Sequence, residues 1–185
     1  ASGNDLMGCD TTLQLGYVYN GEAQDDDLLL DGIDPPPALG YSLLSASVLH
    51  KADPTEILRL TSFYVKGSGS SVSDPPFTEE GGKRMYRWMR GYLPDPSSAP
   101  LRMWHDASGN YRFFLHAGDP VTGQGDLDGI GDGYSMGPGD RRSLMSVGPT
   151  SLGIGDSIEV VYAIVGAAGS DRIRNIDYLR WLTQY

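Results

Sequence analysis

The stretch 157-SIEVVYAIV-165 is the clearest strand signal in the chain, and the expected fold class follows from it. Its residues are β-branched and apolar, as is typical of a β-strand. Both faces of the strand would be apolar, which predicts a central strand that is covered on both sides. The short sequence "GDS" at Gly155–Ser157 predicts a tight turn that leads into this strand.

Outward from this strand, short apolar runs alternate with clusters of glycine, proline and aspartate, which predicts an all-β domain. The 25 glycines and 12 prolines are dispersed along the chain and form no low-complexity tract. Trp104–Asn110 predicts a hairpin turn rather than a catalytic His-Asp pair. The other predicted strands are Thr12–Asn20, Ala38–His50 (one long strand or two short ones), Glu56–Val65, Tyr111–His116 and Arg142–Gly148.

Two segments have helical features. Thr78–Gly91 begins with a possible capping threonine and an acidic first turn, although its glycine pair weakens the helix by about 1 kcal/mol per glycine. Ser170–Tyr185 offers Ser170 as the N-cap and Asp171 in the first turn. Its apolar residues recur every third position and predict a narrow apolar stripe, formed by Ile173, Ile176, Leu179 and Leu182.

These elements predict a single domain over residues 1–185. The expected fold is all-β, a β-sandwich of immunoglobulin-like or jelly-roll-like type, with a short internal helix and a C-terminal helix packed on it. A chain of 185 residues is long enough to bury a core without disulfides. Its single cysteine, Cys9, excludes an intrachain disulfide and a zinc site made of several cysteines.

The charge and hydropathy patterns exclude two classes of partner. The formal net charge is −10, from 24 acidic and 14 basic residues. Such a surface repels nucleic acid and anionic membranes. No apolar run approaches the roughly 18 residues that a spanning helix needs, so we expect no direct membrane insertion.

Two acidic clusters are candidates for calcium binding, because calcium takes six to eight oxygen ligands from carboxylates and carbonyls. The loop 126-DLDGIGDG-133 does not match an EF-hand, since Ile130 occupies the third ligand position. Aspartate and glycine are also the usual residues of turns, so a calcium site and simple turns both stay open. The candidate ligands are Asp126, Asp128 and Asp132 in one cluster and Asp25, Asp27 and Asp31 in the other.

No catalytic constellation is recognisable. The three histidines show no HExxH or HxH spacing, and the serines form no GxSxG motif. The glycines of residues 123–133 follow no clear strand of a βαβ unit, which excludes a dinucleotide-binding loop. The acids sit in glycine loops rather than in an aromatic cleft, which disfavours a glycosidase pair. Cys9 has no histidine close in sequence, so it is a poor nucleophile, and we expect the chain not to be an enzyme.

An ordered set of phrases resembles an uncharacterised β-rich module of large exported proteins from Bacteroidetes, Ignavibacteria and related bacteria. The resemblance spans nearly the whole chain, although after "GDPVTG" this sequence has "QGDLDG" where the family commonly continues with tryptophan. The phrases are "GCDTTLQLGYVYNG" (8–21), "PPALGYSLL" (36–44), "LTSFYVKGSGSSVSDP" (60–75), "YRWMRGY" (86–92), "AGDPVTGQGDLDG" (117–129) and "GDRRSLMSVGPTSLGIGDSIEVVYAIVGAAGSDRIRNIDYLR" (139–180).

The resemblance implies an extracellular or cell-surface location, export through type IX secretion, and membership of a longer exported polypeptide. It carries no catalytic residues to transfer. We therefore expect a structural or adhesion module, calcium-stabilised and capable of self-assembly into filaments. Its expected partners are other copies of itself or other surface proteins, with glycans as a further class. The alternative is an accessory domain of a secreted protease or glycosidase whose catalytic centre lies outside this chain.

Overall fold

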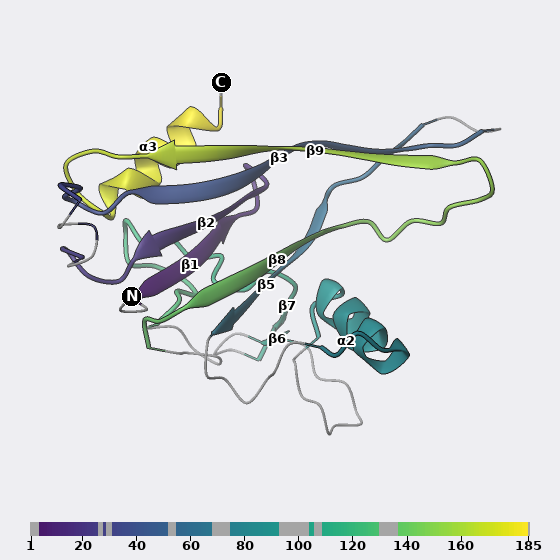
Figure 1. The fold of residues 1–185 in the computed structure, drawn as a ribbon, viewed down its shortest axis with the longest axis horizontal. Helices are drawn as coiled ribbons and strands as arrows, with labels where there is room; N and C mark the ends of the chain where they lie inside the picture. Colours follow the sequence, from purple (N-terminus) through teal and green to yellow (C-terminus); the bar gives the residue numbers. More distant parts are fainter. Residues whose placement is uncertain are drawn as a thin grey trace.

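The described residues of the computed structural model form mostly strands in antiparallel sheets, with the two short helices α2 and α3 (Figure 1). This confirms the prediction of an all-β fold. The structure describes residues 4–25, 28, 31–51, 55–67, 75–92, 104–105, 109–129 and 137–184. The predicted loops over residues 67–76 and 93–100 lie almost wholly outside these ranges.

The larger sheet is built around one long strand pair. Its strands are β1 (Asp5–Asp10), β2 (Leu15–Asn20), β3 (Ala38–Leu49), β9 (Ser157–Ala167) and the short β4 (Glu56–Ile57). β1 pairs with β2 and β2 with β3, while β3 pairs along its full length with β9, all antiparallel. The segment predicted as one long or two short strands is therefore one strand, with an irregularity between Leu43 and Ser45.

A second, two-stranded sheet is made of β5 (Leu60–Gly67) and β8 (Arg141–Val147). In Figure 1, β3 and β9 run side by side along the top of the molecule, and β5 and β8 lie beneath them. The predicted hairpin is confirmed, since β6 (Trp104–His105) pairs with β7 (Tyr111–Arg112).

The segment after β7 connects the two sheets through its backbone. The amide of Phe63 in β5 donates to the carbonyl of Phe113 at 3.1 Å, and the amide of Leu115 donates to Phe63 at 3.0 Å. On its other side, the amide of Cys9 in β1 donates to the carbonyl of His116 at 3.1 Å. Hydrogen bonds thus run from β9 through β3, β2 and β1 to this segment, and on to β5 and β8.

The prediction that Ser157–Val165 is a central strand covered on both sides is wrong. Within the described ranges β9 pairs with β3 and with no other strand, so it lies at the edge of the sheet. Residues Ser157 to Tyr162 are exposed on both faces. An apolar, β-branched sequence reports what the faces of a strand can contact, but not how many neighbours the strand has.

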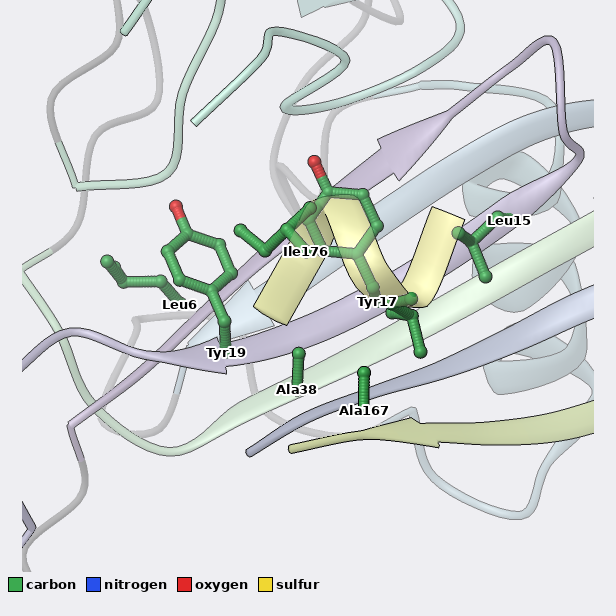
Figure 2. Close-up of a cluster of buried hydrophobic side chains, with 8 residues drawn as sticks. Leu6, Leu15, Tyr17, Tyr19, Ala38, Ala167 and Ile176 are labelled. Atoms are coloured by element: carbon green, nitrogen blue, oxygen red, sulfur yellow. The ribbon is translucent and has the colours of Figure 1, made fainter. Parts of the chain in front are cut away.

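The C-terminal helix α3 (Arg174–Leu182) covers one face of the larger sheet. Ile176 and Leu179 are completely buried there, as the predicted apolar stripe requires. Figure 2 shows Ile176 in a cluster with residues of β1, β2, β3 and β9. At Gly40 of β3 a Cβ atom would lie 2.7 Å from a methyl group of Leu15 and 3.0 Å from one of Leu179, so the contact between helix and sheet requires glycine.

The start of α3 differs from the prediction. Ser170 makes no capping hydrogen bond among the described residues, and the helix begins at Arg174. The carboxylate of Asp171 instead accepts hydrogen bonds from the amides of Ile173 and Arg174, at 2.8 and 3.0 Å. Aspartate satisfies free amides before a helix as well as serine does, and sequence alone does not choose between adjacent candidates.

The internal helix α2 (Glu79–Met89) is confirmed, with Thr78 as its N-cap. The Thr78 hydroxyl accepts a hydrogen bond from the amide of Gly81 at 3.3 Å. A Cβ atom at Gly81 would lie only 1.7 Å from the carbonyl oxygen of Pro76, so this glycine permits the entry of the chain into the helix. Trp88 anchors the helix by stacking on Tyr64 of β5, with ring centroids 5.2 Å apart.

Candidate functional site

Two of the predicted calcium ligands, Asp126 and Asp128, bond the backbone of β1 and of the segment that lies beside it. Asp126 accepts the backbone amide of His116 at 2.8 Å. Asp128 accepts the backbone amide of Met7 at 2.9 Å, and Met7 belongs to β1. Since a buried unpaired amide is costly, these two carboxylates complete the hydrogen bonding of the backbone where no strand is available.

Arg141 occupies both oxygens of Asp128. Its Nε donates to Oδ2 at 2.8 Å and its Nη2 to Oδ1 at 3.1 Å, while Nη2 also donates to the carbonyl of Gly137 at 2.6 Å. The side chains of Arg141 and Asp128 are 2% and 0% exposed. Arg141, from the "GDRR" phrase, thus pairs with a carboxylate of the acidic loop. A two-point pair of this kind neutralises the carboxylate and orients it.

His116 lies between the same two carboxylates and is almost completely buried. Its Nδ1 is 3.6 Å from Asp126 and its Nε2 is 3.7 Å from Asp128. Burial raises the pKa of Asp126, but the contacts with His116 and Arg112 outweigh burial and hold this pKa below its ordinary value. His116 and Asp128 are closed to solvent. The arrangement therefore fits a structural role, in which the cluster fastens the loop that follows His116 to β1.

The second acidic cluster is divided between the interior and the surface. Asp25 is buried, and it accepts hydrogen bonds from the side-chain amide of Asn20 at 2.6 Å and from the backbone amide of Leu28 at 3.2 Å. The Asn20 amide also donates to Asn4 at 3.1 Å, so these polar groups satisfy one another. Asp31 is exposed in a turn.

Four of the six predicted calcium ligands lie among the described residues. Asp27 and Asp132 lie outside the described residues. Among the residues that are described, no group of three or more histidine, cysteine, aspartate or glutamate side chains is placed to hold a metal ion. Asp126 and Asp128 are brought together around His116, whereas Asp25 is buried and Asp31 is exposed.

Cys9 is buried in the core, 1% exposed, and its thiol donates to the carbonyl of Leu115 at 3.4 Å. Burial and the nearby carboxylates of Asp10 and Asp126 raise the pKa of the thiol. A nucleophilic thiolate is therefore disfavoured, because nucleophilic cysteines have lowered pKa values.

The structure reveals a surface that the sequence pattern did not identify, on the side of the β3–β9 pair that faces β8. We call it the ribbon face. It consists of Leu39, Tyr41, Val160, Tyr162 and Ile164, which are 47%, 49%, 45%, 59% and 65% exposed. These side chains are contiguous, since Tyr41 lies opposite Ile164 and its ring centroid is 6.1 Å from that of Tyr162. Contiguous apolar side chains on the surface mark interaction sites.

A groove of about 520 Å³ runs along the ribbon face. One wall is formed by residues of β3 and β9, among them Tyr41, Val160 and Tyr162, and the opposite wall by residues of β8, among them Ser143 and Met145. The groove separates β9 from β8, the two strands at the ends of the hydrogen-bonded path. The sequence signal for the ribbon face was present in Ser157–Val165, whose residues are apolar on both sides of the strand. We interpreted that pattern as burial within the protein, whereas it also fits an exposed contact surface.

The turn that leads into β9 is held by Asp156. Its carboxylate accepts the amides of Lys51 and Gly153, both at 2.9 Å, and bonds Nδ1 of His50 at 2.8 Å. The two amides and His50 lower the pKa of Asp156 to about 2. The hydrogen bond to Asp156 raises the pKa of His50, with a smaller contribution from Glu56. The predicted "GDS" turn thus ties the start of β9 to the end of β3.

No helix among the described residues has the length and apolar character to cross a membrane.

We compared the chain with protein-family models, with curated protein sequences and with solved structures, and none of the three comparisons finds a match.

Proposed function

We propose that this chain is a non-catalytic structural or adhesion module of an extracellular or cell-surface protein, and that it binds protein partners through the β3–β9 pair. The observation that carries the proposal is β9, an edge strand of 11 residues with exposed apolar side chains on both faces. An exposed apolar edge strand is a template for pairing with another chain. Strand addition supplies affinity through main-chain hydrogen bonds and specificity through side chains.

The proposed architecture is a β-sandwich that is open on one side. The larger sheet and the β5–β8 sheet are its two layers, and Leu43, Val48 and Leu60 belong to a buried cluster with members from both. The open side is the groove between β8 and β9. A module of this shape offers a partner both an edge of backbone groups and an apolar face.

The acidic residues support a non-catalytic function. Asp128 is held at two points by Arg141, and Asp126 accepts a backbone amide. Asp25 is engaged by Asn20 and a turn amide. These carboxylates stabilise loops and strand edges, so they are not free to act as general acids or bases. The proposed location follows from the resemblance of the sequence to exported modules.

Site-specific photo-crosslinking in the full-length protein tests the proposal. A photo-reactive phenylalanine analogue at Tyr162 is expected to form a covalent adduct with a protein partner on the cell surface. The same analogue at Phe77, which is fully exposed just before α2 and does not belong to the ribbon face, is the matched control and is expected to give none. Equal labelling at both positions, or none at Tyr162, would contradict binding through the ribbon face.

A hydrolysis assay tests the non-catalytic part of the proposal. The purified chain is incubated with a panel of glycans and peptides, and we expect no turnover. Turnover by the wild-type chain that disappears in the Asp126→Asn variant would show that the acidic cluster is catalytic. That result would contradict the proposed non-catalytic function.

A further inference from the structure

We propose that the partner of β9 is a second copy of this chain, whose β9 pairs with it antiparallel about a two-fold axis at Tyr162. This inference rests on the proposed function and specifies its partner. The resulting sheet would continue from one copy into the other through the two edge strands.

The first argument is that the sequence of β9 carries few of the features that usually guard an edge strand. Edge strands of monomeric proteins are usually guarded by lysine, proline, bulges or short length. β9 spans 11 residues, contains no lysine or proline, and carries one charged residue, Glu159. The irregularity in its pairing with β3 lies at Leu43 and Ser45, in β3. A strand with these properties is suited to a neighbour on both sides.

The second argument is register. A two-fold axis normal to the sheet pairs identical strands antiparallel and keeps each residue on its own face. Tyr162 is the midpoint of Ser157–Ala167, so an axis there pairs the two strands along their full length. Moving the axis by one residue shortens the overlap by two residues. The register at Tyr162 is therefore the one that pairs the largest number of backbone groups.

The third argument is the side-chain pairs that this register creates. Tyr162 lies opposite its own copy, and Val160 lies opposite Ile164. Aromatic and β-branched cross-strand pairs of this kind stabilise antiparallel sheets. Glu159 lies opposite Val165, so the two glutamates are far apart along the strands, whereas an axis at Glu159 would set like charges directly against each other. Both copies present the ribbon face on the same side of the joined sheet.

The fourth argument is area. Ile158, Val160, Tyr162 and Ile164 of β9 are 44% to 65% exposed. Edge pairing covers the backbone edge and only the flanks of these side chains, because the ribbon face itself stays open. The pair of copies therefore buries less than about 1,000 Å², which is the size range of weak interfaces. Such a contact is self-complementary and closes after two copies, so we expect a weak dimer rather than a filament.

Sedimentation velocity over a range of concentrations tests the dimer. The wild-type chain is expected to pass from monomer to dimer in the micromolar range. Tyr162→Lys places two like charges on the axis and is expected to weaken the dimer at least tenfold. Tyr41→Lys is the matched control, since Tyr41 belongs to the ribbon face but lies on β3, away from the pairing edge, and its dimer should weaken much less. Equal weakening by both variants would indicate stacking of the faces and overturn edge pairing.

A charge-complementation experiment tests the position of the axis. Tyr162→Glu alone should also be monomeric, because glutamates would face each other. An equimolar mixture of Tyr162→Lys and Tyr162→Glu should recover the dimer, since the two side chains then meet as opposite charges. Failure of the mixture to associate would overturn a two-fold axis at Tyr162.

The wild-type chain provides a measurement that does not depend on a variant folding. Amide hydrogen exchange in residues 157–167 should slow as the protein concentration rises, while exchange in α3 should not change. A wild-type chain that stays monomeric at about 200 μM, with exchange in β9 independent of concentration, would overturn the inference. A crosslink from Tyr162 to a different protein would then still support the proposed function, so the two failures are distinguishable.

Discussion

At the scale of single residues, the aspartates of this chain act mainly on its backbone. Asp128 accepts an amide of β1 and Asp126 the amide of His116 beside it, while Asp156 holds the turn before β9 and Asp171 holds the start of α3. Each carboxylate accepts a hydrogen bond from a backbone amide that has no carbonyl partner in a neighbouring strand or helix of the described residues. The sequence identified turn-forming aspartates correctly as a class. It could not show that Asp128 is buried against Arg141, because their contact depends on how the intervening loop folds.

Removing the charge of Asp128 is expected to destabilise the fold strongly. Asp128→Asn removes the negative charge that pairs with the buried Arg141 guanidinium, and breaking a buried pair in this way costs about 3 kcal/mol or more. Urea unfolding of wild type and variant measures this difference. Asp31→Asn removes an exposed carboxylate and is the control, expected to change stability by less than about 0.5 kcal/mol. Equal stability of the two variants would show that the Asp128–Arg141 pair does not stabilise the fold.

The turn before β9 should make thermal stability depend on pH through His50 and Asp156. The raised pKa of His50 stabilises the fold fully below its ordinary value of 6.5, and this contribution is lost as the pH rises through the raised pKa. The lowered pKa of Asp156 stabilises the fold above 3.8, and this contribution is lost as the pH falls toward about 2. Melting temperatures of wild type and His50→Gln should therefore differ most near pH 5 and converge at alkaline pH. A difference that is constant with pH would contradict the pairing.

At the scale of elements, the sequence predicted the existence of strands and helices better than their surroundings. β2, β3, β8 and both helices were expected within a few residues of their observed bounds. The segment Glu56–Val65 was expected as one strand, but it divides into β4 of the larger sheet and β5 of the second sheet. The apolar stripe of α3 was expected too, and its burial against the sheet follows from a spacing that the sequence displays. The position of β9 was not expected, because strand order depends on contacts between distant segments.

The docking of α3 is expected to contribute a large share of stability through Leu179. This side chain is completely buried and contacts the sheet at Gly40. Leu179→Ala should lower the free energy of unfolding by about 2–5 kcal/mol, from lost burial and the cavity that remains. Ile154→Ala removes a similar volume from a fully exposed position and should cost little. Denaturant unfolding compares the two, and a similar cost for both would contradict this role of α3.

At the scale of the whole molecule, net charge opposes the proposed association. Each copy carries a formal net charge of −10, so two copies repel each other, and this repulsion is strongest at low salt, where screening is weak. The apolar contact along β9 is short-ranged and does not weaken as salt screens this repulsion. Assembly through β9 is therefore a balance between a local apolar attraction and a global electrostatic repulsion.

Salt is expected to strengthen the dimer for this reason. Raising sodium chloride from about 20 mM to about 500 mM shortens the screening length from roughly 20 Å to under 5 Å and reduces the repulsion. Sedimentation velocity should show a lower dissociation constant at high salt. A dimer that weakens with salt would indicate an interface held by ion pairs rather than by β9.

Calcium binding at either acidic cluster would act on the stability of the whole molecule. If the native chain binds calcium, the ion should raise the melting temperature and a chelator should lower it, since a ligand that binds only the folded state stabilises that state. Magnesium at the same concentration is the control for ionic strength. No shift on chelation would count against the prediction.

The sequence by itself determined the fold class, the apolar and polar faces of the strands, the helical stripe and the turn chemistry, because each depends on residues close together in the chain. Only the tertiary structure decided that Asp128 meets Arg141 and that β9 lies at an edge with its apolar faces exposed. Both facts arise from contacts between segments far apart in sequence, where the side-chain pattern specifies the chemistry of a surface but not the segment that covers it.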